Sequence, residues 1–345
     1  MNVIDKVLRQ PEFEEYPPVL VDVGASSGVN PAWRALAKYS ICIAFDADDR
    51  GMDQTHRDSK LYKQLHVYNR ILTSGAETMS DFYLTQDAPC SSMLLPDTEG
   101  LSVWEFADRF SVVEKQTVQT TNLTTVLTQL NLSRVDWFKT DSQGIDLRLF
   151  LSLGDVLAQK VLVAEFEPGI IDAYQGDDKL WTLMSRMHDR GFWLSDMSVL
   201  GSNRIRKDLV KCFTRFERNY MVHLLKTSPG WAEVTYMNSF SGNELGKREY
   251  LLGWVCASIK QQYGFALELA VGAKARFADS LFESLQQHSL TAIRRSYLNL
   301  PAYFPLFRRA LRRWKRLGLH WEHPTAGLAA SGRGEGVSSK DTCGN

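Results

Sequence analysis

The feature that most constrains the fold is an alternation, over residues 18–225, of short apolar β-branched runs with longer segments of helical period. This alternation is typical of a parallel sheet, because each parallel strand needs a crossover, usually a helix, before the next strand. Several runs are apolar almost throughout, as strands buried on both faces should be. We therefore expect an α/β fold: a Rossmann-like sheet with helices on both faces. The expected strands are residues 19–23, 41–45, 65–72, 135–140, 161–166 and 192–194.

The overall composition excludes several classes of protein. The 345 residues carry 40 basic and 40 acidic side chains, so no global field draws the chain to nucleic acid, and we expect no nucleic-acid partner. Five cysteines without a CxxC pair indicate a reduced, cytoplasmic compartment rather than a disulfide framework. The N-terminus does not resemble a signal peptide, and the charge-free apolar run 250–259 is about half the ~20 residues that span a bilayer.

The most informative segment is VLVDVGASSGVNPAW, residues 19–33, where an apolar strand runs into a glycine-containing turn and then a helix start. Side chains at Gly24 or Gly28 would obstruct a ligand lying against the backbone. Asn30 before Pro31 predicts a capped helix, whose free N–H groups suit a carboxylate; an ordinary capped helix without a ligand is the alternative. The residues expected to contact a cofactor here are Asp22, Gly24, Ala25, Ser26, Gly28 and Asn30.

The turn lacks the glycine motifs of dinucleotide-binding and P-loop proteins, and this limits the ligands it can bind. Ser26 stands where the second glycine of GxGxxG would admit a pyrophosphate, which disfavours NAD or FAD, and no GK[ST] follows to form a P-loop. Asp46, about twenty residues beyond the turn, ends the second apolar run and can accept hydrogen bonds from both ribose hydroxyls. Asp48 and Asp49 are the alternatives, which we interpret as solvated loop acids.

Five segments in this order resemble the FkbM-type methyltransferase family: VDVGASSGVNP, FDAD, PCSSML, WFKTDSQGIDLRLF and VAEFEP, within residues 19–200. The FKTDSQG segment is the most specific of them. The resemblance implies a class I fold that binds S-adenosyl-L-methionine and usually methylates a hydroxyl oxygen. The chain departs from the family at Asp46, where such proteins often carry Glu followed by Pro, and beyond about residue 226, which the likeness does not cover.

We therefore expect four parts in the chain: an N-terminal segment 1–18, an FkbM-like methyltransferase domain 19–225, a mostly helical extension 226–324, and a disordered tail 325–345. The extension is expected to be helical because apolar positions recur every three or four residues through 250–287. The tail is rich in Gly, Ser and Ala without a hydrophobic period. Between the third and fourth strands, segments 81–96 and 115–130 mix strand-like and helix-like residues.

Methylation of a hydroxyl benefits from a base that takes its proton, and the carboxyl ends of the strands are where such sheets place ligands. Asp141 is the first catalytic candidate, with a helix cap as the alternative role. Glu165 is the second, because Glu165 and Glu167 lie two apart and would share a face. A divalent cation bound by these acids is a minority alternative, and no metal is expected. The residues expected to line the acceptor pocket are Ser91, Ser92, Gln143 and Glu167.

The acceptor expected from this pattern is a small molecule or a glycan. The basic and apolar segment 304–319 could contact a membrane interface, which would place the protein peripherally on the inner face, or pack on the main domain. Two rival functions stay open: another nucleotide-dependent Rossmann enzyme such as a dehydrogenase, and a methyltransferase-fold binding module without activity. The sequence leaves the oligomeric state unknown.

Overall fold

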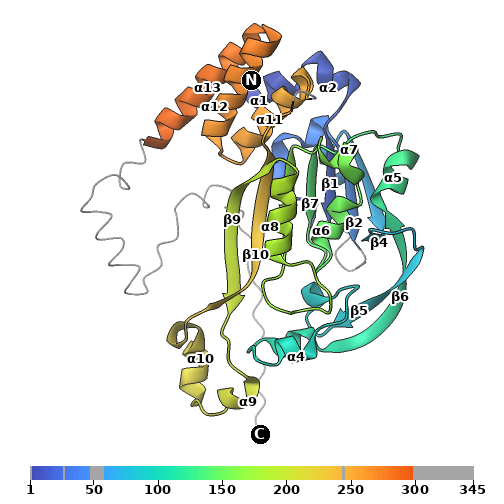
Figure 1. The fold of residues 1–345 in the computed structure, drawn as a ribbon, viewed down its shortest axis with the longest axis vertical. Helices are drawn as coiled ribbons and strands as arrows, with labels where there is room; N and C mark the ends of the chain where they lie inside the picture. Colours follow the sequence, from blue (N-terminus) through green and yellow to red (C-terminus); the bar gives the residue numbers. More distant parts are fainter. Residues whose placement is uncertain (1, 26–27, 47–57, 243–244, 298–345) are drawn as a thin grey trace, which may run out of the picture. The chain divides into compact units, whose positions relative to one another are not determined.

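The structure is a computed structural model that describes residues 2–25, 28–46, 58–242 and 245–297 (Figure 1). The chain divides into two compact units, residues 1–291 and 292–345, and the fold described below lies in the first. Ser26, Asp48, Asp49, the segment 304–319 and the tail 325–345 lie outside the described residues. Among the described helices, none combines the length and the apolar composition needed to cross a bilayer.

A mainly parallel sheet forms the centre of the first unit. Within the described part of the chain, seven strands pair in the order β3-β2-β1-β7-β8-β10-β9, with β10 antiparallel to both neighbours. The first five strands in this order reproduce the Rossmann order. The order in which successive strands are added reverses between β1 and β7, which makes this position the topological switch point. The prediction of a Rossmann-like α/β sheet is confirmed. The strands are β1 Val19–Val23, β2 Ile41–Asp46, β3 Gln64–Asn69, β7 Trp137–Thr140, β8 Val163–Phe166, β9 Phe192–Ser202 and β10 Ser228–Asn238.

Helices cover both faces of this sheet, as the alternation predicts. One face packs Leu20, Trp137 and Val163 against Trp33 and the helices α11 Lys247–Ile259 and α12 Tyr263–Phe277. The other face packs Val21, Phe138 and Ala164 against α5 Leu123–Gln129, α6 Asp146–Leu151 and α8 Leu180–Asp189. The two buried clusters show why strands β1, β7 and β8 are apolar on alternate and adjacent positions alike.

The C-terminal extension is helical, as predicted, but it does not begin at residue 226. Strand β10 lies beyond that boundary and fills a place inside the sheet between β8 and β9. Helices α11 and α12, together with the start of α13 Ser280–Tyr297, share one buried cluster with the sheet. The extension is therefore one covering layer of the same core, because its buried residues belong to the same cluster as those of the sheet.

The N-terminal segment is also part of this core. Its helices, α1 Val3–Leu8 and α2 Pro11–Glu15, contribute Val7, Leu8 and Phe13 to the buried cluster. Arg248 of α11 donates to the Tyr16 and Pro17 carbonyls and forms a buried, bidentate ion pair with Asp136, with both Nη–Oδ distances at 2.8 Å. The Arg248 guanidinium thus joins the N-terminal segment and the residue that precedes β7 to α11.

The insertion forms a small sheet of its own, with strand order β4-β6-β5 among the described residues. The expected third strand, 65–72, is split between the two sheets: β3 stays in the main sheet, and β4 Ile71–Thr73 pairs with β6 Val112–Asn122. Strand β5 Met79–Thr85 pairs antiparallel with β6. Between them lie α4 Thr98–Leu101 and two short 3-10 helices, η5 Ala88–Cys90 and η6 Ala107–Phe110.

Candidate active site at the carboxyl edge of the sheet

The glycine turn after β1 lies at the topological switch point, directly against the loop after β7. The Asp141 N–H donates to the Val23 carbonyl at 3.0 Å, and the Gly24 N–H donates to the Phe45 carbonyl at 3.0 Å. Gly24 has φ +83°, and a Cβ there would lie 2.5 Å from the Asp141 carbonyl oxygen. Gly24 is therefore required by the protein's own backbone, whereas the sequence suggested that it makes room for a ligand.

The Asp22 side chain contacts Asn30, which follows the turn, and Lys139 of the neighbouring strand β7. Its side chain is 1% exposed, accepts the Asn30 N–H at 2.8 Å, and lies 3.0 Å from Lys139 Nζ. Burial raises the pKa of Asp22, and the Lys139 ammonium opposes that rise. Burial alone would lower the pKa of Lys139, but Asp22 and Asp141 outweigh it and the pKa is raised. Asp22 is therefore placed to shape the turn, and its carboxylate is already paired.

The Asn30 prediction is confirmed as a cap but not as the start of an α-helix. Its Oδ1 accepts the Ala32 N–H at 3.0 Å, and the element that begins at Pro31 is a short 3-10 helix, η1 Pro31–Ala35. Gly28 has φ +101° and donates its N–H to the Ala25 carbonyl at 3.1 Å. The N–H groups of Gly24, Ala25 and Gly28 thus all donate to carbonyls of the protein's own backbone.

Glu165 does not stand free at the edge as a base. Its Oε2 accepts from Asn30 Nδ2 at 2.9 Å and Trp137 Nε1 at 3.1 Å, and its Oε1 lies 2.6 Å from Lys260 Nζ. In the sheet, Asp22, Lys139 and Glu165 are direct cross-strand neighbours, so they form a row of alternating charge. The structure therefore gives Glu165 a positioning role, holding Asn30 against the sheet, in place of the expected catalytic one.

Glu167, which follows the last residue of β8, faces the other acids. Burial, together with the nearby charges of Asp141, Asp146 and Glu233, raises the pKa of Glu167 to about 8. Asp141 Oδ1 accepts from Gln143 Nε2 at 2.6 Å. Glu167 is therefore largely protonated at neutral pH, and a carboxyl group of this kind among other acids is suited to proton transfer.

Asp146 also lies at the carboxyl edge of the sheet, and it was not among the site residues predicted from the sequence. This carboxylate is 1% exposed and accepts from Thr140 Oγ1, the Ser142 N–H and hydroxyl, and the Glu167 N–H, the last at 2.8 Å. Burial raises its pKa to about 6. Asp146 thus fixes the loop after β7 to the end of β8. The helix α6 begins at Asp146 with no side-chain cap, so the alternative role of Asp141 as its cap is wrong.

The expected acceptor residues make structural contacts. Ser92 is 1% exposed and donates to the Gln143 carbonyl at 2.7 Å, and the Ser91 hydroxyl accepts the Thr85 N–H at 3.1 Å. Gln143, at φ +56°, accepts from the Tyr174 hydroxyl at 3.0 Å. Ser92 and Gln143 therefore join the insertion to the acidic edge, and Gln143 touches Asp141 directly.

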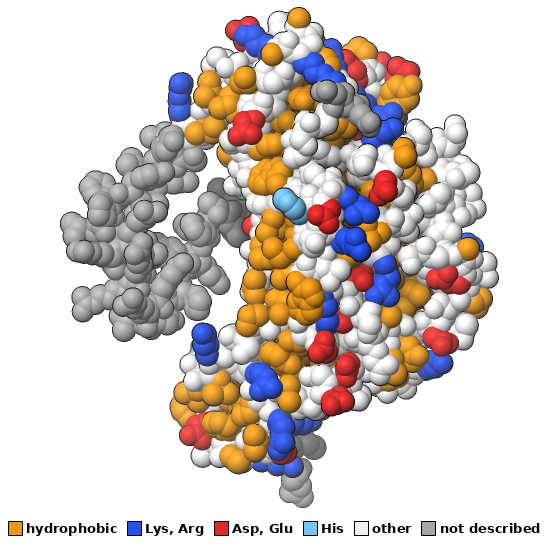
Figure 2. Space-filling model, in the orientation of Figure 1, with side chains coloured by type: hydrophobic (Ala, Val, Ile, Leu, Met, Phe, Trp, Pro, Cys, Tyr) orange, Lys and Arg blue, Asp and Glu red, His pale blue; other side chains and the backbone are white. Residues whose placement is uncertain are grey.

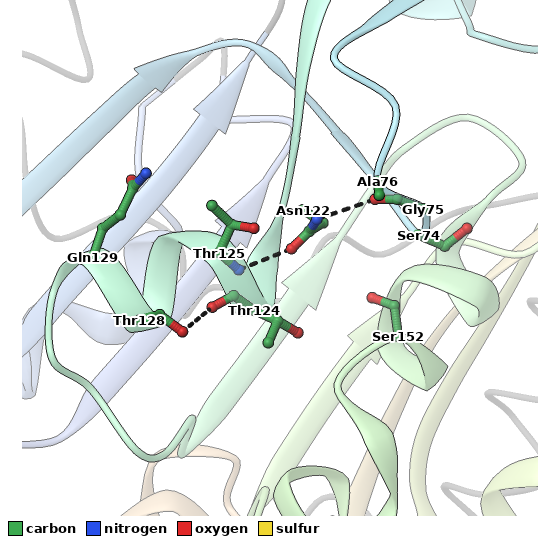
Figure 3. Close-up of a pocket in the computed structure, with 9 residues that line it drawn as sticks. All are labelled: Ser74, Gly75, Ala76, Asn122, Thr124, Thr125, Thr128, Gln129 and Ser152. Atoms are coloured by element: carbon green, nitrogen blue, oxygen red, sulfur yellow. Dashed lines mark hydrogen bonds between the residues drawn. The ribbon is translucent and has the colours of Figure 1, made fainter.

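Asp46 ends β2 beside the turn, because Val23 and Phe45 are paired in register. A separate hollow of about 600 Å³ lies between the Ser74–Ala76 turn and α5 (Figure 3). Its lining is hydroxyls and amides without an ionisable group, which offers no acid–base chemistry. The lining residues are Ser74, Gly75, Ala76, Asn122, Thr124, Thr125, Thr128, Gln129 and Ser152. Among the described residues, no group of three or more His, Cys, Asp or Glu has an arrangement that could hold a metal ion.

Comparison with known proteins identifies no family for this chain. No family model and no curated protein matches the sequence. Similar solved structures include an uncharacterized protein from Listeria monocytogenes serotype 4b (11% identity, TM-score 0.29, 85% of this chain and 96% of that one). A precorrin-6y C5,15-methyltransferase from Geobacter metallireducens shows 11% identity and TM-score 0.30 over 69% and 86% of the two chains.

A third similar structure is a Streptococcus pneumoniae protein described as a candidate tRNA (m1A22) methyltransferase, in complex with S-adenosyl-L-methionine. It shows 12% identity and TM-score 0.27, over 85% of this chain and 96% of that one. At these TM-scores the likeness supports no inference about fold or activity.

Proposed function

We propose that this chain is an S-adenosyl-L-methionine-dependent methyltransferase that transfers the methyl group to a hydroxyl oxygen of a sugar, glycan or other small metabolite. The observation that carries the proposal is the charge of the carboxyl edge. Asp141 and Asp146 lie near Glu167 there and their charges raise its pKa, Asp46 ends the neighbouring strand, and the nearby Lys139 is held by the Asp22 carboxylate.

This charge distribution separates the proposed donor from a dinucleotide. A pyrophosphate needs N–H donors or cations, and the first N–H groups of the turn, those of Gly24 and Ala25, donate to the Phe45 carbonyl. A sulfonium cation is attracted to carboxylates. The residues present therefore fit S-adenosyl-L-methionine: the turn from Gly24 to Gly28 would support it, and Asp46 would accept from its ribose hydroxyls. When bound, this cofactor supplies an electrophilic methyl group.

The chain's own residues would then supply alignment and a proton acceptor. Asp141 and Glu167 lie at the switch point, where a bound acceptor would meet the donor. A hydroxyl has a high pKa and becomes a better nucleophile as its proton moves to a base. The Asp141–Glu167 pair would accept that proton, while Asp146 fixes the Glu167 backbone and Gln143 donates to the Asp141 carboxylate.

The proposal also covers the family of the protein, its compartment and the class of its acceptor. The motifs quoted above support membership of the FkbM-type family and a small-molecule or glycan acceptor, and five cysteines without a CxxC pair support a cytoplasmic protein. The anionic edge supports an acceptor without phosphate groups, because phosphate would be repelled by the same carboxylates.

The donor site is tested by isothermal titration calorimetry with S-adenosylhomocysteine and, separately, NAD. We expect binding of the former alone, and a loss of at least tenfold in affinity for Asp46→Ala. The matched control is Asp155→Asn, an exposed acid on α7 Gly154–Ala158, which should bind normally. Binding of NAD instead would favour a dehydrogenase, and binding of neither ligand would favour an inactive binding module.

A further inference from the structure

The hairpin formed by β9 and β10 extends beyond the catalytic edge and carries a helical arm, residues 203–227. Strand β8 ends at Phe166, which pairs through Val234 with Met197, and β9 continues for residues 198–202 beyond that point. Five strand residues reach about 16 Å. Since β9 runs parallel to β8, the arm lies on the same side of the sheet as the carboxyl edge (Figure 1).

The arm is anchored at its base. Asn203 is buried, its side chain donates to the Leu225 carbonyl at 3.4 Å, and its own carbonyl accepts the Glu105 N–H at 3.3 Å. Lys207 forms an ion pair with Asp108 of the insertion. The arm carries α9 Lys207–Val210 and α10 Arg215–Leu224, and α10 begins with a capping box between Thr214 and Glu217.

Helix α10 is amphipathic with its apolar stripe turned outward. Phe216, Tyr220 and Leu224 follow each other at intervals of four, so they lie on one side of the helix. They are 71%, 47% and 57% exposed, and the Phe216 and Tyr220 rings are 4.7 Å apart. Met221, by contrast, is buried. An amphipathic helix normally buries its apolar side, so this exposed stripe indicates a surface that becomes covered by a partner.

The charge around the stripe identifies the kind of partner. The arm has seven basic residues and two acidic ones, Asp208 and Glu217, and all seven basic side chains are exposed. Five of the seven form no ion pair within the described part of the chain. These five are Arg204, Lys211, Arg215, Arg218 and Lys226. Figure 2 shows the basic and hydrophobic side chains gathered together on the lobe at the lower left, where α9 and α10 lie.

We propose that the arm docks on the surface of an anionic lipid bilayer. Exposed aromatic and aliphatic side chains surrounded by Lys and Arg are the composition that inserts at a headgroup boundary, with the cations on the anionic lipid. The exposed aliphatic side chains of Leu209 and Leu224 can insert among lipid acyl chains but cannot stack on nucleic-acid bases. This favours a membrane over a nucleic acid as the partner. The surface concerned differs from the segment 304–319.

The arm and the carboxyl edge point the same way, so a docked arm would bring the acidic pair close to the bilayer. If the proposed function holds, the substrate class that fits the site is a lipid-anchored acceptor whose reacting hydroxyl carries no neighbouring phosphate group. Membrane docking itself needs neither cofactor nor activity. Its test can therefore fail or succeed separately from S-adenosylhomocysteine binding.

The test is co-sedimentation of the full chain with vesicles of phosphatidylcholine, with or without phosphatidylglycerol. We expect binding to the anionic vesicles that weakens as salt is raised. Phe216→Ser with Leu224→Ser, and separately Arg215→Glu with Arg218→Glu, should each reduce binding by at least tenfold. The matched control, Val156→Ser with Lys160→Glu, changes an exposed apolar residue and an exposed lysine near α7 and should bind normally.

Two further measurements make the outcome decisive. Circular dichroism and calorimetry with S-adenosylhomocysteine should show that the arm variants fold and bind as the unaltered chain does. A variant with the six basic residues of 304–319 changed to Gln should keep most of the vesicle binding. Overturning results are vesicle binding unchanged in both arm variants, a dimer by sedimentation velocity that Phe216→Ser dissociates, or binding of single-stranded RNA in place of vesicles.

Discussion

The raised pKa of Glu167 predicts that Glu167→Gln makes the protein more stable at alkaline pH. A carboxyl group whose pKa is higher in the folded state than in the unfolded state holds its proton more tightly when folded. Its favourable contribution is present below the unfolded pKa and is lost as the pH rises through the folded pKa. For Glu167 this window runs from its ordinary value of 4.5 to about 8.

The size of the effect follows from that window. The rise in pKa corresponds to an upper limit of about 5 kcal/mol, and partial contact with solvent reduces this to about 2–3 kcal/mol. We therefore expect the free energy of unfolding of Glu167→Gln to exceed that of the unaltered chain by about 2 kcal/mol at pH 9, and to match it at pH 4. Urea unfolding, followed by tryptophan fluorescence at both pH values, measures the difference.

The matched control is Glu165→Gln, the same chemical change two residues away. Glu165 is paired with Lys260 and accepts from Asn30 and Trp137, so losing its charge should destabilise the fold by about 2 kcal/mol at pH 9. The two variants thus have opposite signs. A Glu167→Gln protein that is no more stable than the unaltered chain at pH 9 would refute the assignment of a buried proton to Glu167.

Activity should change in the opposite direction. If the pair must lose its proton before it can accept one, turnover with an acceptor found by labelled-methyl screening should rise about tenfold from pH 7 to pH 9. Glu167→Gln should lower turnover by about 10²–10⁴-fold and abolish that rise. A gain in stability coupled to a loss of activity is what a strained catalytic carboxyl pair requires.

Three further predictions follow from the same structure. Gly24→Ala should cost about 2–5 kcal/mol of unfolding free energy in urea melts, because it combines a positive φ with a Cβ against the Asp141 carbonyl; a cost below about 1 kcal/mol would contradict that contact. Arg248→Met should cost about 3–5 kcal/mol by leaving Asp136 buried and unpaired, and Asp136→Asn in the same chain should recover part of it. S-adenosylmethionine should bind more tightly than uncharged S-adenosylhomocysteine in calorimetry, with a preference that shrinks as salt rises; equal affinities at low salt would argue against an anionic donor site.

The parts of the fold that depend on local pattern were predictable. Strands β1 and β2 match their predicted bounds to within one residue, because each is a short apolar run bounded by turn residues. Strand β10 was not predicted, because it returns antiparallel after the arm and only a long-range pairing places it between β8 and β9. The packing of α11 on the sheet was not predictable for the same reason, because a helical period shows that one face of a helix is apolar but not what that face packs against.

The site was predictable in its location and less so in its roles. Alternation along a strand predicts that Glu165 and Glu167 share a face, but β8 ends at Phe166 and Glu167 leaves the sheet. The two glutamates therefore meet different partners, Lys260 for one and Asp141 for the other. One sequence signal does point to Asp146: it is an acid two residues after Gly144, at the start of a helix, where a carboxylate is favoured.

The distribution of charge explains why the catalytic edge can remain acidic without destabilising the core. Across the sheet, Asp22, Lys139 and Glu165 alternate in sign, and Lys260, at the end of α11, pairs with Glu165, so each of these charges has a partner and the row is close to neutral. At the edge, the charges of Asp141, Asp146 and Glu233 act together on Glu167, and the repulsion is relieved by a proton on Glu167. A cationic donor would relieve it as well, so donor binding should release that proton and leave the pair ready to accept one from a hydroxyl. The same repulsion that raises the pKa would in this way couple donor binding to activation of the base.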